Sequence, residues 1–172
     1  SIVDPGTSTN DLWLVDLRSG DRIALTTTRG YTGAPVWSRD STPRLAYAYA
    51  PPGQLDDVYI KDLRTGKEEP VIESQAVLEH PVAWSRDGAS MLVWTADDKG
   101  NTLSRWSSGS KILTRFAGSG TQWAAFSPDD RYVAFASQES GSTEVSVTTF
   151  PERRQTWSLA TKGDRVLSWS AD

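Results

Sequence analysis

The sequence predicts an all-β chain that folds as a β-propeller, built from about four repeats of a four-stranded antiparallel blade. Three observations support this prediction. A short aromatic motif recurs at a nearly constant interval, similar strand-like segments follow each copy, and eight Trp, five Tyr and four Phe are many for 172 residues. Aromatic residues favour pleated, half-buried surfaces, so the composition also indicates β-structure.

The repeated motif is an aromatic residue followed by Ser, any residue and Asp. Its four copies begin at Trp37, Trp84, Phe126 and Trp169 and end at Asp40, Asp87, Asp129 and Asp172. The aromatic positions are separated by 47, 42 and 43 residues. A period of about 40–45 residues is the length of one four-stranded propeller blade.

Each repeat contains four short segments with the character of strands, separated by turns rich in Gly, Asp, Ser and Pro. The first segment ends at the motif aromatic, and the second is an apolar run at 45–48, 91–94 and 133–136. The third lies at 12–15, 58–61, 103–106 and 145–148, and the fourth at 22–26, 69–73, 111–116 and 155–160. Helical periodicity never extends beyond about two turns.

The motif predicts two structural roles. The aromatic side chain ends the inner strand of a blade and fills the space between neighbouring blades. The Asp carboxylate accepts backbone N–H groups in the turn that follows. Gly88 suits a left-handed turn position after Asp87, whereas Ser41 and Asp130 stand there in two other repeats. We expect those two turns to be looser.

Composition and charge exclude several classes of function. The net charge is −4, the cations are scattered singly, and there is no Cys. We therefore expect no nucleic-acid partner, no disulfide and no thiolate metal site. The longest apolar run, residues 45–50, is far shorter than the ~20 residues of a membrane span. The first residues also lack the basic start and apolar core of a signal peptide.

Signatures of catalysis and of metal binding are weak. His80 is the only imidazole, and the chain lacks a Gly-x-Ser-x-Gly elbow, so we expect no catalytic residues. Paired carboxylates at 56–57, 97–98 and 129–130 lie in or beside turns, and we expect them to cap these turns. Too few nitrogen, sulfur or spaced oxygen ligands are present for zinc or calcium, so we expect neither a metal nor a cofactor.

A candidate binding site comes from the repeat itself. Gly33, His80, Gln122 and Arg165 each stand four positions before a motif aromatic. These positions begin the inner strands, where side chains can reach the central channel of a propeller. His80, Gln122 and Arg165 are therefore candidate residues for binding a ligand or peptide at the channel mouth. The alternative is that they are ordinary solvated residues of that mouth.

The motif segments that begin at Pro35, Trp84 and Phe126 resemble the blade motif of the TolB-like, WD-type β-propeller family. The resemblance covers nearly the whole chain. Residues 137–151 are similar to a narrower group, the propellers appended to bacterial eukaryotic-like Ser/Thr kinases. Propellers of this family serve as docking platforms in bacterial envelope complexes, as sensor regions after kinase domains, and as gating domains of prolyl-oligopeptidase-like hydrolases. The resemblance implies a bacterial, extracytoplasmic location.

The phase of the repeats predicts how the chain relates to a whole propeller. Both ends fall within a blade, because the chain begins late in a second strand and ends directly after an inner strand. We therefore expect residues 1–172 to form a single domain that is part of a larger propeller, since six to eight blades would need roughly 260–340 residues. The cut edges would let the isolated chain close on its own ends or associate with a second copy.

These observations favour a non-enzymatic module of a larger protein, which binds a protein or peptide partner or senses a ligand. The alternative is the gating propeller of a prolyl-oligopeptidase-like serine hydrolase, without its catalytic domain. A third possibility, a lactonase-like enzyme with a channel metal, is disfavoured because converging carboxylates and Asn are lacking. The propeller fold alone does not choose between these functions.

Overall fold

The computed structural model describes residues 2–4, 9–74, 77–118, 120–138, 140–160 and 168–170. The regular structure in these ranges consists of β-strands alone. They form three complete four-stranded antiparallel sheets and two two-stranded sheets. The predicted all-β fold of four-stranded blades is therefore confirmed. Within the described ranges, no helix is long and apolar enough to cross a membrane.

Each complete sheet follows the chain from its inner to its outer strand, and we call the three sheets blades 1, 2 and 3. Blade 1 consists of β5 (Tyr31–Trp37), β6 (Arg44–Ala50), β7 (Asp57–Asp62) and β8 (Glu68–Ile72). Blade 2 consists of β9 (Leu78–Trp84), β10 (Ser90–Asp97), β11 (Gly100–Ser107) and β12 (Leu113–Gly118). Blade 3 consists of β13 (Gly120–Phe126), β14 (Tyr132–Ser137), β15 (Glu144–Thr149) and β16 (Thr156–Ala160). The motif aromatic ends the inner strand of each, as the repeat predicts.

Four short strands precede blade 1, and we call them the N-terminal blade. They are β1 (Ile2–Asp4), β2 (Thr9–Asp11), β3 (Trp13–Val15) and β4 (Arg22–Ala24), paired β1 with β2 and β3 with β4. The sequence predicted one strand over 12–15, but Leu12 separates two. The Leu12 N–H donates to the Thr26 hydroxyl at 2.9 Å, and its carbonyl accepts the N–H of Leu25 at 2.8 Å. A side-chain hydroxyl thus replaces a backbone acceptor where the ladder is interrupted.

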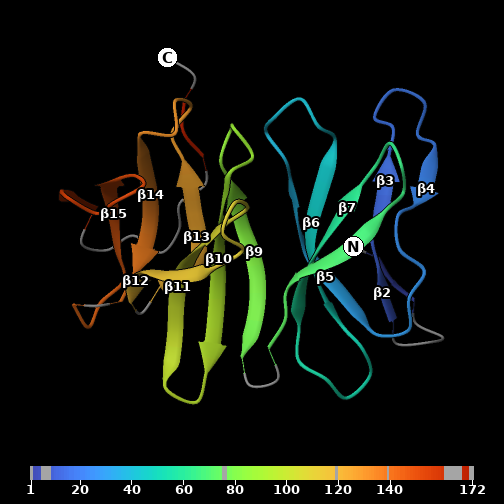
Figure 1. Cartoon of the computed structure of the whole chain (residues 1–172), viewed down its shortest axis with the longest axis horizontal. Helices are drawn as coiled ribbons and strands as arrows, with labels where there is room; N and C mark the ends of the chain where they lie inside the picture. Colours follow the sequence, from blue (N-terminus) through green and yellow to red (C-terminus); the bar gives the residue numbers. More distant parts are fainter. Residues whose placement is uncertain are drawn as a thin grey trace.

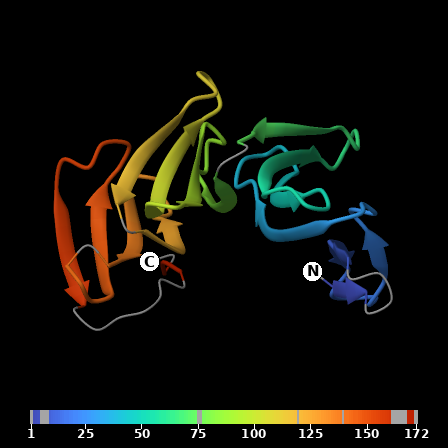
Figure 2. The same cartoon turned by 90° about the horizontal axis from the view of Figure 1, so that it is seen from below.

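The sheets follow one another around an open arc (Figures 1 and 2). The inner strand β9 contacts both β5 and β13, so the inner strands lie together on one side of the sheets. The described strands do not close into a ring, which is consistent with a partial propeller.

The last predicted inner strand, which should end at Trp169, is not present among residues 168–170, because these three residues have no regular structure. The Trp169 indole nevertheless donates to the carbonyl of Ala125 in β13, at 3.0 Å. The motif aromatic therefore contacts the preceding blade although its own backbone is not paired there. Arg165 and Asp172 lie outside the described residues.

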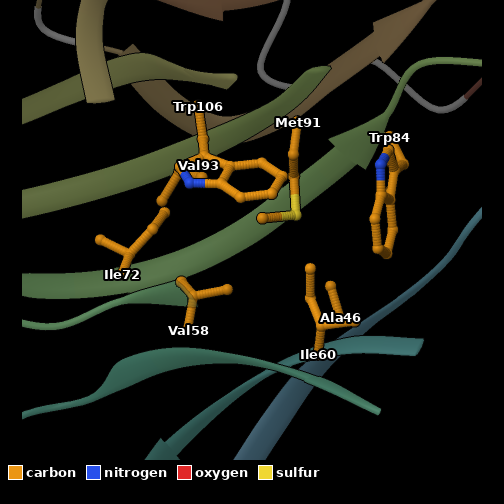
Figure 3. Close-up of a cluster of buried hydrophobic side chains, with 8 residues drawn as sticks. All are labelled: Ala46, Val58, Ile60, Ile72, Trp84, Met91, Val93 and Trp106. Carbon is orange, nitrogen blue, oxygen red and sulfur yellow. The ribbon is translucent and has the colours of Figure 1, made fainter. Parts of the chain in front are cut away.

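Neighbouring blades are joined by buried apolar faces. Between blades 1 and 2, four residues of blade 1 meet four of blade 2 (Figure 3): Ala46, Val58, Ile60 and Ile72 against Trp84, Met91, Val93 and Trp106. Between blades 2 and 3, Leu92, Leu103, Phe116 and Ala117 meet Phe126, Val133 and Phe135. A smaller cluster of Leu12, Leu45 and Tyr47 joins the N-terminal blade to blade 1. Alternation along each strand supplies both faces, because successive side chains point to opposite sides of a sheet.

The predicted inter-blade role of the motif aromatic is confirmed for Trp84 and Phe126, which are both buried, but it is wrong for Trp37. Trp84 is 1% exposed, whereas Trp37 is 49% exposed. The Trp84 side chain packs against β6 and β7 of the preceding blade. The corresponding second strand of the N-terminal blade is β1, which has only three residues. The described part of that blade therefore leaves half of the Trp37 surface uncovered.

The predicted role of the motif Asp in the turn is confirmed in blade 2. The Ser85 hydroxyl accepts the N–H of Ser90 at 2.9 Å and donates to Asp87 at 2.6 Å, and Asp87 accepts the N–H of Ala89 at 2.9 Å. The Ser85 hydroxyl, followed by the Ala89 N–H, lowers the pKa of the Asp87 carboxyl. Motif Ser and Asp together satisfy the backbone groups of the hairpin.

The motif Ser and Asp also bond the hairpin in the other two complete blades, although in blade 1 the Ser38 hydroxyl donates to the carbonyl of Thr42 and not to Asp40. Asp129 accepts the Ser127 hydroxyl at 2.7 Å and the N–H of Arg131 at 3.1 Å. Asp40 accepts the N–H of Thr42 at 3.1 Å and forms an ion pair with Arg44. The motif is therefore a repeated turn device, and its Ser and Asp have a structural reason to recur.

We predict that Trp84→Ala lowers the free energy of unfolding by roughly 3–5 kcal/mol, because it empties a large buried volume between two blades. Trp37→Ala removes the same side chain from the same motif position where it is half exposed, so it should cost less than about 1 kcal/mol. Urea unfolding followed by circular dichroism compares the two variants. Equal losses would show that the aromatic does not act through inter-blade packing.

We also predict that Asp87→Ala lowers the free energy of unfolding by about 1–2 kcal/mol, because a hydroxyl and a backbone N–H lose their acceptor. Asp98→Ala, in the exposed turn between β10 and β11, removes a carboxylate without a comparable hydrogen-bond network and serves as control. Thermal unfolding at neutral pH measures both. A melting temperature of Asp87→Ala equal to that of Asp98→Ala would contradict the turn role.

Candidate functional site

The candidate site lies where the inner strands begin, and we call this the loop end of the structure. His80, near the start of β9, faces Asp56 of the connection between β6 and β7, and its Nε2 bonds the Asp56 carboxylate. The imidazole stacks on Tyr31, with centroids 6.4 Å apart, and lies 5.3 Å from the ring of Trp94 at a tilt of 46°. One imidazole is thus held by a carboxylate between two aromatic rings.

Local pairing explains how residues far apart in sequence reach this place. Tyr31 begins β5, and His80 is directly opposite Trp94 in the β9–β10 ladder. The N–H of Glu79 donates to the carbonyl of Asp56 at 3.0 Å, which ties the β6–β7 connection of blade 1 to the inner strand of blade 2. The site is therefore built across two blades by backbone hydrogen bonds.

Glu79, next to His80 on β9, places a buried carboxyl at the loop end of the structure. Its side chain is 3% exposed, and its Oε2 has no hydrogen-bond partner. Burial, followed by the nearby Asp57 carboxylate, raises the pKa of Glu79 from 4.5 to about 7. Unpaired carboxylates are expensive to bury, so the neutral acid is the favoured form inside this interface at pH values below 7.

A groove with a volume of about 700 Å³ opens beside these residues. It is lined by Gly53, Gln54, Leu55, Asp57, Glu73 and Ser74. The walls come from the connection between β6 and β7 and from the chain that leaves β8. Asp57 lines the groove, accepts the N–H of Ser74 at 3.0 Å and contributes to the raised pKa of Glu79.

The structure assembles only part of the site predicted from sequence. His80 lies at the loop end, as expected. A Cβ at Gly33 would overlap the Tyr31 hydroxyl, so Gly33 contributes space for that ring rather than a side chain. Gln122 lies in β13, but its side chain is outside what the structure describes, as is the whole of Arg165. The proposed grouping of His80, Gln122 and Arg165 is therefore neither confirmed nor contradicted.

Sequence reasoning missed the partners of His80. The expected turn-capping role holds for Asp97, which accepts the N–H of Lys99 at 2.8 Å, and for Asp129. It is wrong for Asp56, which binds His80 instead. A possible signal was the spacing: Asp56 directly precedes the third strand, at the end of the blade where His80 begins the next inner strand.

The side chains at this site provide aromatic faces and carboxylates. Among the described residues, no group of three or more His, Cys, Asp or Glu side chains is arranged to hold a metal ion. The aromatic ring of Tyr31 is 39% exposed and can contact a ligand directly. Aromatic faces together with carboxylates provide apolar contact, hydrogen-bond acceptors and attraction for cations.

No family model matches the chain, and no curated protein matches it in sequence. Solved structures do match its fold. TolB from Acinetobacter baumannii superposes with a TM-score of 0.75 at 21% identity, over 90% of this chain and 38% of that protein. An oligogalacturonate lyase from Vibrio parahaemolyticus has a TM-score of 0.60 at 19% identity, over 83% of this chain and 42% of the lyase.

A third similar structure is a dipeptidyl aminopeptidase IV homologue from Bacteroides ovatus, with a TM-score of 0.61 at 12% identity, over 85% of this chain and 31% of that protein. At these identities the comparisons show the fold alone: the four-stranded blades match those of β-propellers such as TolB. The chain spans well under half the length of each of the three proteins.

We predict that the pH dependence of stability reports on Glu79. Its raised pKa means that the folded protein keeps a proton that the unfolded chain loses above pH 4.5. The resulting stabilisation is complete below about pH 4.5 and is lost as the pH rises through about 7, by roughly 2–3 kcal/mol. Glu79→Gln should remove this part of the pH dependence, as measured by urea unfolding between pH 5 and 8.

The control for this experiment is Glu69→Gln, an exposed Glu paired with Lys67 at the opposite end of blade 1. The neighbouring residues Asp56, Asp57 and His80 are unchanged in both variants. If the Glu79→Gln variant keeps the full pH dependence of the parent protein, the buried carboxyl is not its source.

Proposed function

We propose that this TolB-like propeller chain is a non-catalytic binding module of a larger protein, and that it binds a protein or peptide partner at its loop end. The observation that carries the proposal is the cluster at the start of the inner strands, where His80 is fixed by Asp56 between Tyr31 and Trp94. Loops presented by a rigid scaffold are frequent binding surfaces, because loops that are already ordered lose little conformational entropy when a partner binds.

Recognition explains this cluster better than catalysis does. A nucleophilic device needs a hydroxyl or thiol within hydrogen-bond reach of the imidazole. The Nε2 atom of His80 instead bonds the Asp56 carboxylate, and the rings of Tyr31 and Trp94 lie next to the imidazole. The imidazole is thereby oriented and desolvated, as an interface residue would be.

The biological setting is also part of the proposal. The resemblance of residues 137–151 to propellers appended to bacterial Ser/Thr kinases favours a sensor or docking role within a receptor-like polypeptide. In that role the blades would present the loop end to an extracytoplasmic partner, while another domain transmits the signal.

A second candidate function is the gating propeller of a serine hydrolase. It is favoured by the similarity in fold to the dipeptidyl aminopeptidase IV homologue, although that similarity concerns the fold alone. The two functions differ in the full-length protein. Hydrolysis of a chromogenic dipeptide substrate by that protein, abolished by a serine-directed inhibitor, would favour the hydrolase; absence of hydrolysis is expected for a binding module.

We predict that a peptide library displayed on phage yields binders that depend on the loop end. The double variant Tyr31→Ala/His80→Ala should lose most of the affinity, by about tenfold or more, because aromatic side chains at an interface carry much of the binding energy. Trp157→Ala, which removes a similarly exposed aromatic from the outer strand β16, is the matched control. Peptides that bind the double variant as tightly as the parent would place recognition elsewhere.

A further inference from the structure

The groove at the loop end has a strongly one-sided charge. Of the six residues that line it, Asp57 and Glu73 are ionisable, and both are acidic. No cation is among them. Two carboxylates at the edge of a low-dielectric surface reinforce each other's negative potential, so this groove attracts positively charged groups.

A second observation comes from Glu79 on β9, whose N–H donates to the carbonyl of Asp56 beside the groove. The Oε2 atom of Glu79 is buried without a hydrogen-bond partner, and the Glu79 carboxyl is close enough to Asp57 to feel its charge. Buried acceptors in folded proteins are nearly always paired, and an unpaired one indicates a missing donor. A cation placed at Asp57 would relieve the repulsion between Asp57 and Glu79.

An exposed apolar side chain in the groove favours a cation that also has an apolar part. Leu55 lines it and is 37% exposed. A Lys or Arg side chain has an aliphatic stem that can cover Leu55, while its charged head reaches the carboxylates. A metal ion fits less well, since the described residues hold no group of three ligands suited to one.

We infer that the groove between residues 53–57 and 73–74 binds a basic side chain, arginine or lysine, from the protein partner. The inference rests on the proposed binding function and names the chemistry of the partner: a basic, exposed segment. Asp57 and Glu73 accept hydrogen bonds from the cation, Leu55 contacts its stem, and the bound cation favours ionisation of the nearby Glu79 carboxyl.

Proton linkage follows from this arrangement. A cation at Asp57 favours the ionised form of Glu79, so binding releases a proton when the free protein holds one. Affinity for a basic ligand should therefore increase as the pH rises from 5 to 8. The charged group that acts on Glu79 from a neighbouring element is Asp57 of β7. Asp56, in the β6–β7 connection, bonds His80, which follows Glu79 on β9.

The test uses a fluorescently labelled short peptide of alternating arginine and glycine, and its counterpart with glutamate in place of arginine. Fluorescence anisotropy should show binding of the basic probe alone, weakened by salt.

Asp57→Asn and Glu73→Gln should each reduce the affinity by about tenfold, as expected for the loss of one charge-assisted contact. Glu69→Gln makes the same charge change at the other end of blade 1 and should leave the affinity unchanged. Glu79→Gln should flatten the pH dependence of binding.

The inference is overturned if both probes bind equally, or if Glu69→Gln weakens binding as much as Asp57→Asn. Its failure can be told apart from failure of the proposed function. Library peptides that require Tyr31 and His80, together with no binding of the basic probe, would retain the binding module and reject the basic ligand. Binding of the basic probe that depends on Asp57, together with library peptides indifferent to Tyr31 and His80, would retain the groove and reject the aromatic site.

Discussion

The rest of the structure depends on the apolar contact between successive blades. A four-stranded sheet has two faces, and in blade 2 both are packed against a neighbouring blade: Leu92 packs toward blade 3, while Met91 and Val93 pack toward blade 1. Burial of such side chains contributes roughly 1.5–3 kcal/mol each, so the stability of a blade comes largely from its neighbours. Trp84 is buried because a complete blade covers it, whereas Trp37, next to the short strands of the N-terminal blade, stays half exposed.

The turns at the other end of the blades reinforce these contacts. The Arg44 guanidinium lies 4.8 Å from the Trp84 ring centroid and pairs with Asp40, which links the motif of blade 1 to that of blade 2. A Cβ at Gly88 would overlap the Asp40 carboxylate, so glycine is needed there for space as well as for its φ of 70°. Asp130 adopts a φ of 57° without being glycine and accepts the N–H of Arg86 at 2.5 Å. The sequence predicted a looser turn at this position, but Asp130 keeps the left-handed conformation. The hydrogen bond to the neighbouring blade compensates the backbone strain of Asp130.

The fold was predictable because its signal is local and repeated. Aromatic-Ser-x-Asp identifies a strand end and a turn within four residues, and strand alternation supplies the faces. Trp94 lies opposite His80 within blade 2, through the β9–β10 register. Asp56 and Tyr31 were not predictable as partners of His80, because they belong to blade 1 and only the packing between blades brings them to His80 of blade 2. Leu12 and Trp37 deviate for the same reason: a hydroxyl from Thr26 and the extent of a neighbouring blade decide their structure, and neither is visible in their local sequence.

The two ends of the blades have different physical characters. At the turn end, motif carboxylates are paired with hydroxyls, backbone N–H groups and arginines, as in Asp87 and Asp40. At the loop end, Glu79 is buried without a partner for one oxygen, and Asp57 and Glu73 line an open groove. Charges already satisfied inside the protein offer little to a partner, whereas unsatisfied ones gain free energy when a complementary group arrives. At the loop end Asp57 already accepts the N–H of Ser74 at 3.0 Å, and Glu79 Oε2 is the buried carboxyl oxygen without a partner, so the proposed binding function depends mainly on Glu79 and on the exposed side of the groove.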